Sequence, residues 1–148
     1  MNFSLDIKDF AEKTSRNIQD VKAEVASDLF GAIIKSTPVG NSKYWQNPKA
    51  PKGYVGGRLR GNWQTSINTP ILTTTPRIDP NGNDTIKEMQ QEVQKAVGDQ
   101  TIYMTNNLPY AVRVEYGHSR QQRPEGMVRV NILAFENAIA EAIRNLPK

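Results

Sequence analysis

Apolar residues recur at every third or fourth position along the first quarter of the chain, which is the spacing of one face of an α-helix. Ser4 or Asp6 can cap this helix, charged residues fill its other face as far as Ser36, and Pro38 prevents its continuation. At about 1.5 Å per residue the helix would be roughly 45 Å long, so we expect one end to project beyond its own core. The stripe consists of Ile7, Phe10, Ala11, Thr14, Ile18, Val21, Val25, Leu29, Ile33 and Ile34.

Two later stretches have the composition and alternation of β-strands. Leu59, Trp63 and Ile67 predict a strand over Arg58–Asn68, with a β-prone continuation over Ile71–Thr75. The stretch Gln100–Thr105 alternates Ile102 and Met104 with Tyr103 and Thr105, as a half-buried strand does. We expect it to pair with the strand that contains Trp63.

Three further helices are expected in the second half of the chain. The first begins at Asp84 or Thr85 as a cap, after the turn cluster that starts at Asp79, and runs to about Val97. The second follows Pro109 and is ended by Gly117; the third runs from about Met127 to Asn145. The first residues of this last helix, Met127–Ile132, also alternate and are compatible with a short strand.

These elements predict an α+β fold in a single domain, residues 1–148. The long N-terminal helix and the C-terminal helix would pack on one face of a small, mainly antiparallel sheet. A segment over about 38–57, rich in Pro, Gly, Asn and Lys, interrupts the pattern as a long inserted loop. Irregular segments of this length are uncommon in compact domains and are usually functional. Its aromatic residues Trp45 and Tyr54 either dock on another subunit or fold back onto their own domain, and we favour docking.

Composition narrows the possible functions. The chain has no cysteine, which excludes disulfides and thiolate chemistry, and 37% hydrophobic residues make a lean core that partners would help to cover. No apolar run approaches the ~20 residues that cross a bilayer, and the N-terminus lacks a signal-peptide pattern. We therefore expect no membrane association and no secretion.

Charge is distributed unevenly along the chain. No acidic residue occurs between Asp28 and Asp79, whereas the other segments together hold 12 basic and 15 acidic residues. The acid-free interval is either a solvated basic loop or a surface that faces DNA or an acidic partner ring. Its seven cations are Lys35, Lys43, Lys49, Lys52, Arg58, Arg60 and Arg77.

The stretch Thr105–Val130 holds the only histidine and the densest set of candidate functional residues. His118 and Glu115 are three residues apart and resemble an acid–base pair, with arginines nearby for a phosphate. The structural alternative, which we favour, is that Glu115 anchors the loop by pairing with Arg113, Arg120 or Arg123. One of Tyr110 and Tyr116 should pack on the sheet, with Asn106 or Asn107 as a hydrogen-bond partner. No cofactor or metal site is expected, because the chain lacks clustered ligands.

Four motifs resemble, in the same order, a family of tailed-bacteriophage neck or tail-completion proteins. They are F-S-L-D-I-K-D-F-A-E-K at residues 3–13, T-P-V-G at 37–40, G-G-R-L-R-G-N-W at 56–63, and N-N-L-P-Y-A-x-x-V-E-Y-G-H-S-x-Q followed by P-x-G-M-V-R at 106–129. In that family, many members pass almost directly from the second motif to the third, so the segment between them here resembles an insertion.

The resemblance implies a structural virion protein, made in the host cytoplasm, and not an enzyme. It would form a ring of sixfold or twelvefold symmetry that joins the head connector to the tail and lets DNA pass with weak contacts only. Its partners would be itself, connector or head-completion proteins, and tail-tube or tail-terminator proteins. The alternative is a small nucleic-acid-binding or nuclease-like domain that uses His118 and the basic inserted loop over about 38–57, which we call the arm. The expected docking residues are Trp45, Tyr54, Arg58, Arg60, Tyr110, Glu115, Tyr116, His118, Arg120 and Arg123.

Overall fold

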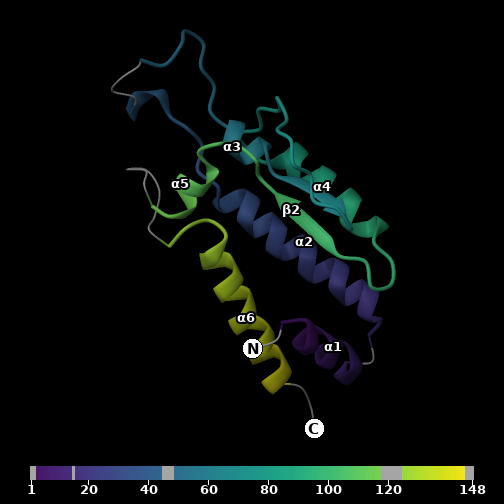
Figure 1. The fold of residues 1–148 in the computed structure, drawn as a ribbon. Coiled ribbons are helices and arrows are strands. Elements are labelled where there is room, and N and C mark those ends of the chain that lie inside the picture. Colours follow the sequence, from purple (N-terminus) through teal and green to yellow (C-terminus); the bar gives the residue numbers. More distant parts are fainter. Residues whose placement is uncertain (1–2, 15, 45–48, 118–124, 146–148) are drawn as a thin grey trace.

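The computed structural model describes residues 3–14, 16–44, 49–117 and 125–145 (Figure 1). Within these ranges the chain is α+β, as predicted, with six α-helices, one 3-10 turn and a two-stranded antiparallel sheet. No helix in these ranges is long and apolar enough to span a bilayer. The elements are α1 (Phe3–Lys13), α2 (Ile18–Ser36), η1 (Ser42–Tyr44), α3 (Arg58–Gly61), β1 (Gln64–Ile67), α4 (Asn83–Lys95), β2 (Ile102–Thr105), α5 (Ala111–Glu115) and α6 (Arg129–Arg144).

The N-terminal apolar stripe forms two helices, so the prediction of one long helix was wrong. The Thr14 hydroxyl donates to the Phe10 carbonyl (2.8 Å), and Asn17 adopts an extended conformation in which its side chain accepts from the Gln19 N–H (2.8 Å). Asparagine is better satisfied as a cap than inside a helix. The break lets α1 fold back against α2 and pack on α6 (Figure 1). The apolar periodicity of the sequence runs through Asn17 without interruption, although Asn17 is the residue that separates the two helices.

The sheet pairs the two segments that the sequence predicted, but it is shorter. β1 and β2 are antiparallel, with Gln64 opposite Thr105 and Ile67 opposite Ile102. The predicted strand over Arg58–Asn68 was wrong in its first half, because Arg58–Gly61 forms helix α3 and buries Leu59. The predicted β continuation over residues 71–75 has no regular structure.

The core lies where α2, α3, α4, α5 and the sheet meet. Helix α4 packs against both α2 and β1, whereas α6 packs on α1 and α2 (Figure 1). The helix that covers the sheet most closely is therefore α4, and not the C-terminal helix as predicted. On the sheet, Ile102 and Met104 pack against the core, as predicted for β2, but all four residues of the strand are half-buried. The buried apolar residues of this cluster are Ile33, Ile34, Leu59, Trp63, Met89, Val93, Leu108, Ala111, Val114 and Met127.

The last two helices begin and end close to the predicted positions. α5 ends before Gly117, which has a φ of +76° and so favours glycine. Residues 125–128 form turns that lead directly into α6, so the alternative of a short strand over Met127–Ile132 was wrong.

The backbone of Gly61 in α3 lies close to the backbone of Arg77. Two glycine substitutions test whether this close approach stabilises the fold. A Cβ on Gly61 would lie 2.6 Å from the Arg77 carbonyl oxygen, so Gly61→Ala should lower the free energy of unfolding by about 2 kcal/mol. Gly31→Ala is the matched control, since its Cβ would meet only Met89 Cε at 3.9 Å. Removing a mid-helix glycine should raise stability by about 0.5–1 kcal/mol. Urea midpoints that shift the same way in both variants would contradict this account of α3.

Candidate docking surface

Arg60 ties the end of α2 to the rest of the domain. Its guanidinium donates to the carbonyls of Thr37 (2.7 and 3.0 Å), Lys35 (3.0 Å) and Pro80. The last carbonyls of a helix have no partner within the helix. Arg60 donates to two carbonyls at this end, those of Lys35 and Thr37. Burial lowers the pKa of Arg60, and the charge of Asp79 opposes this. The Nε, Nη1 and Nη2 atoms of Arg60 all donate to carbonyls of the same chain. Few of its N–H groups are therefore available for the docking role that the sequence predicted.

Trp63 and Thr37 join the second and third motifs in the core. The Trp63 indole N–H donates to the Thr37 hydroxyl (2.7 Å), which in turn donates to the Ile33 carbonyl (2.8 Å). Thr37 is fully buried, and Trp63 is 7% exposed. The Trp63 indole N–H and the Thr37 hydroxyl thus both have a partner. A buried polar group without a partner would cost about 1–3 kcal/mol of stability. The T-P-V-G and G-N-W segments are parts of one structural unit.

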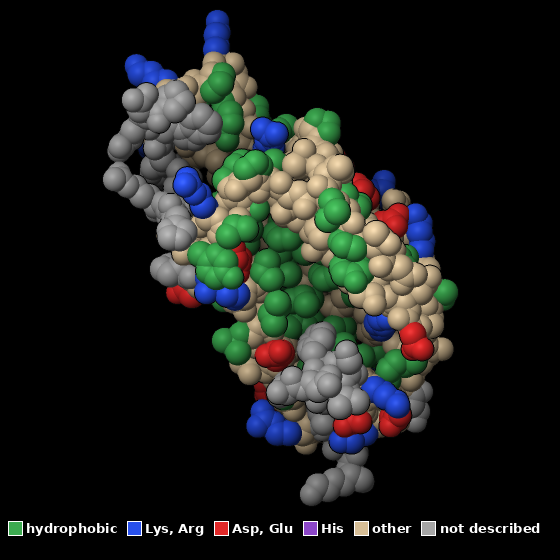
Figure 2. Space-filling view, in the orientation of Figure 1, with side chains coloured by type: hydrophobic (Ala, Val, Ile, Leu, Met, Phe, Trp, Pro, Cys, Tyr) green, Lys and Arg blue, Asp and Glu red, His purple; other side chains and the backbone are tan. Residues whose placement is uncertain are grey.

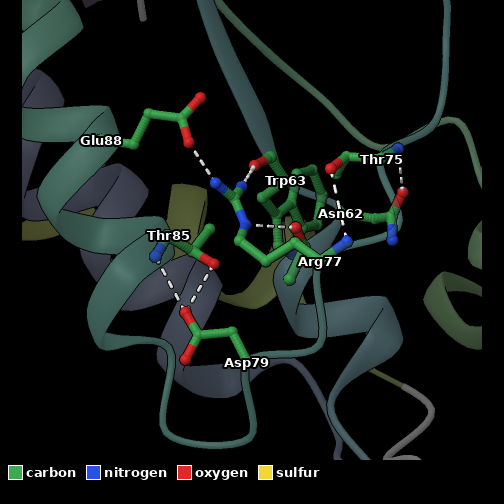
Figure 3. Close-up of polar contacts among 8 residues, drawn as sticks. Asn62, Trp63, Thr75, Arg77, Asp79, Thr85 and Glu88 are labelled. Atoms are coloured by element: carbon green, nitrogen blue, oxygen red, sulfur yellow. Dashed lines mark hydrogen bonds and ion pairs between the residues drawn. The ribbon is translucent and has the colours of Figure 1, made fainter.

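Arg77 holds the irregular segment after β1 against α3 and α4 (Figure 3). Its guanidinium donates to the carbonyls of Gly61 (2.8 Å) and Trp63 (2.9 Å), and it forms an ion pair with Glu88 of α4. Asn62, fully buried, accepts from the Thr75 N–H (3.0 Å) and donates to the Arg58 carbonyl (2.8 Å). These contacts connect α3, β1, α4 and the irregular segment that follows β1.

Asp79 caps α4 from outside the helix, which corrects the expectation that Asp84 or Thr85 would do so. Its carboxylate accepts from the Thr85 N–H (2.8 Å) and the Thr85 hydroxyl (2.7 Å) (Figure 3). It also accepts from the Gly82 N–H (3.0 Å). Burial by itself would raise the pKa of Asp79, but these hydrogen bonds and the charge of Arg77 outweigh it and lower the pKa.

The two asparagines of the fourth motif bind backbone and not tyrosine. The Asn106 amide donates to the Leu59 carbonyl (2.8 Å), and the Asn107 amide donates to the carbonyls of Ile71 (2.8 Å) and Thr73 (3.1 Å). The expectation that one of Tyr110 and Tyr116 packs on the sheet, with one of these asparagines as its hydrogen-bond partner, is wrong, because both tyrosines are exposed. Instead the asparagines fasten the fourth motif to the third and to the segment after β1.

Glu115 holds the start of α6. Its carboxylate accepts from the N–H groups of Met127 (2.8 Å), Val128 (2.9 Å) and Arg129 (3.0 Å), and from the Arg129 guanidinium (3.1 Å). Burial opposes ionisation, but the backbone and guanidinium hydrogen bonds outweigh it and lower the pKa of Glu115. Gly126 passes so close that a Cβ there would overlap this carboxylate. Glu115 is an anchor, as favoured from the sequence, but its partner is Arg129 and not Arg113.

The two ends of the arm contact each other. Gly56 lies against the backbone of Gly40, and the Tyr54 hydroxyl lies where a Cβ on Gly40 would be. Tyr54 therefore contacts its own chain at the arm's base, while Lys43, Lys49 and Lys52 are exposed. The arm lies at the end of the molecule beyond α3, away from α1 (Figure 1).

Several expected docking residues lie together on the outside of this scaffold. Arg58 is exposed and, with Tyr54, lies within electrostatic range of Tyr110, which is 40% exposed and whose pKa is raised by burial. Tyr116 is 58% exposed and stacks on the Arg129 guanidinium, 4.7 Å from the ring centroid. Both groups consist of aromatic rings and arginines, which is the composition of many interface centres.

Four predicted residues, Trp45, His118, Arg120 and Arg123, lie outside the described residues. The structure adds Arg77, Asp79 and Arg129, whose importance was not predicted. A signal existed for Asp79, because it opens a turn cluster directly before a helix. No local pattern marks Arg77 or Arg129, since their partners are far away in the sequence. In the described part of the chain, no three His, Cys, Asp or Glu residues are grouped as metal ligands.

The anchoring role of Glu115 predicts a pH-dependent loss of stability. Glu115→Gln should destabilise the fold by about 2 kcal/mol at neutral pH, because three N–H groups and a guanidinium lose their charged acceptor. A lowered folded-state pKa stabilises the fold above the unfolded value of about 4.3, and this contribution is lost as pH falls through the folded value. The difference between the two proteins should therefore shrink in acid.

Glu125→Gln is the control for this experiment, since Glu125 is exposed in the same turn region. Its urea midpoint should follow the unmodified protein from pH 7 to pH 3. A difference between Glu115→Gln and the unmodified protein that stays constant over this range would contradict the role of the ionised carboxylate.

Comparison with known proteins adds no relative to this picture. No family model, no curated protein and no solved structure matches the chain. The resemblance to phage neck proteins therefore rests on the motifs themselves, and their structural roles are the basis for a functional proposal.

Proposed function

We propose that this protein is a structural component of a tailed-bacteriophage virion that forms a ring in the neck. The ring would join the head connector to the tail and leave an axial passage for DNA. The proposal combines the four ordered motifs with the way in which their residues are used in the fold.

The observation that carries the proposal is the mutual bonding of three motifs. Thr37 bonds to Trp63, Arg60 bonds to the end of α2, and Asn106 bonds to the Leu59 carbonyl. Residues that specify an active site would converge on a cleft and leave reactive groups open to it. Here the polar groups satisfy one another, so these motifs specify a scaffold. Such a scaffold supports a role in which surfaces, and not a reaction centre, are presented.

The state of Glu115 also favours docking over acid–base chemistry. A general base works best with a pKa near the working pH and with access to a substrate proton. Glu115 has a lowered pKa, and its carboxylate oxygens are occupied by three backbone N–H groups and one guanidinium. Glu115 is therefore a poor partner for His118 in the nuclease-like alternative.

The location of the protein tests the function directly. Mass spectrometry of purified particles should detect it in a low, fixed copy number per virion, and antibody labelling should place it at the head–tail junction. A protein absent from purified particles, together with hydrolysis of nucleic acid that His118→Ala abolishes, would replace the proposal with the enzyme alternative.

Charge reversal separates the two parts of the acid-free interval. Arg58 is exposed and its charge acts on Tyr110, so Arg58→Glu should block the joining of heads to tails by placing a carboxylate in the docking surface. Lys49→Glu with Lys52→Glu alters only exposed arm residues and should allow joining. Electron microscopy of particles from complementation assays would score both. Normal joining in both variants would mean that the basic interval is a solvated surface.

A further inference from the structure

Among the described residues, helix α6 has an apolar face that no other element covers. Every described side chain of this helix is at least partly exposed. Leu133 is 59% exposed and Val130 is 41% exposed, on the same side of the helix as Ala134 and Ala138. A soluble domain usually buries one stripe of a helix and exposes its polar side. This helix exposes apolar residues on a second side.

The uncovered face continues onto α5. Val112 is 67% exposed and lies one turn from Tyr116, whose ring stacks on Arg129 at the start of α6. Arg113 is exposed on the same short helix. We call this surface, Val112, Arg113, Tyr116, Val130 and Leu133, the α5–α6 face. Figure 2 shows apolar side chains over this side of the molecule, next to basic ones.

A second exposed apolar surface lies where α2 begins and β2 begins. The Gln19 side chain donates to the Gly98 carbonyl (2.9 Å) and joins these two ends. Beside this bond, Val97 is 65% exposed and Ile18 is 38% exposed, with Asp20 and Asp99 also exposed. We call this surface, Ile18, Asp20, Val97 and Asp99, the α2–β2 end.

The α2–β2 end lies at the rim of a groove of about 870 Å³ whose lining is mostly apolar. Ile18 and Asp99 are part of that lining, together with Val25, Leu29, Phe30 and Ile102. Figure 2 shows apolar side chains in the hollow beside β2. An exposed apolar helix face and an apolar groove are complementary in polarity, and helices commonly dock in such grooves.

The charges of the two surfaces are also complementary. Around the groove, Arg16 pairs with Glu24 and Lys22 donates to the Gln100 carbonyl. Lys8 and Glu12 also line the groove, with opposite charges. In the described part of the chain, Asp20 and Asp99 form no ion pair. Their carboxylates suit the guanidinium of Arg113, which the α5–α6 face presents.

We infer that the α5–α6 face of one copy docks on the α2–β2 end and its groove in a second copy. The two surfaces lie on different sides of the molecule, with α5 and α6 on one side and the turn between α4 and β2 on the other (Figure 1). A contact between two unlike surfaces is heterologous, and its repetition generates either a closed ring or a filament. The inference rests on the self-association in the proposed function and specifies the surfaces that make it.

Disulfide cross-linking tests this contact. The chain has no native cysteine, so every disulfide must come from the introduced residues. The full-length chain with Leu133→Cys and Val97→Cys places one thiol on each surface. Under mild oxidation it should give a ladder of covalent dimers, trimers and larger species on non-reducing gels. Each single-cysteine variant should give no ladder, because it carries only half of the heterologous contact.

Leu133→Cys with Leu72→Cys is the matched control, since Leu72 is 79% exposed and lies outside both surfaces. It should not form the ladder. A ladder in this control, no cross-link in the Leu133/Val97 pair, or efficient dimers from Leu133→Cys alone would each overturn the inference. Efficient dimers of that last kind would indicate a symmetric contact between identical faces.

Charge reversal in the doubly cysteine-substituted chain tests the polar part of the contact. Arg113→Glu should suppress the ladder, and adding Asp20→Arg and Asp99→Arg to the same chain should restore it. A ladder that ignores Arg113→Glu, or that the added substitutions do not restore, would contradict the pairing. Virions that contain the protein but give no ladder would refute this contact alone, whereas a ladder without virion location would refute the proposed neck function alone.

Discussion

The fold depends on how the end of α2 is satisfied. Arg60 donates to the carbonyls of Lys35 and Thr37, and the Thr37 hydroxyl connects the Ile33 carbonyl to the Trp63 indole. A helix end placed inside a domain needs such partners, because each unpaired polar group costs about 1–3 kcal/mol. The same arginine also reaches the Pro80 carbonyl, so the turn before α4 is fixed by the same group. Loss of this tie would separate α2, α3 and α4 together.

Two carboxylates extend the scaffold from this centre by the same physical means. Asp79 satisfies the start of α4, and Glu115 satisfies the start of α6, each from outside the helix that it caps. Helix N-termini favour negative charge, and the resulting hydrogen bonds lower the pKa of both acids. Because Glu115 fixes where α6 begins, it also determines the position of Arg129 under Tyr116. The hydrogen bonds of Glu115 thereby determine where the exposed Tyr116 and Arg129 lie.

The distribution of polar and apolar groups agrees with an assembling protein. The buried side chains of Thr37, Asn62, Asp79 and Thr85 are hydrogen-bonded within the domain. Apolar side chains on α5, α6 and the α4–β2 turn are exposed. Isolated exposed apolar residues are ordinary, but grouped ones indicate interaction sites. The lean composition noted in the sequence has its structural counterpart in α6, which has no fully buried side chain among its described residues.

Sequence reasoning succeeded where the determining interactions are local and failed where they are distant. The α+β class, the pairing of β2 with the strand after Trp63, and the limits of α5 follow from periodicity and glycine placement. The single N-terminal helix was wrong because Asn17 acts as a cap within a periodic stripe. The strand predicted at Arg58 was wrong because burial of Leu59 and close approach at Gly61 require a helical turn.

The candidate site divides in the same way. The sequence by itself favoured Glu115 as an anchor, which follows from its residue type and its position before a glycine and a charged loop. It wrongly placed one of Tyr110 and Tyr116 on the sheet, since both side chains are exposed. Only the tertiary structure decided that Arg129 is the partner of Glu115 and that Arg60 is engaged by carbonyls. It also decided which apolar residues stay exposed. A hydrogen bond between distant residues depends on where the backbone brings them, and no local pattern encodes that position.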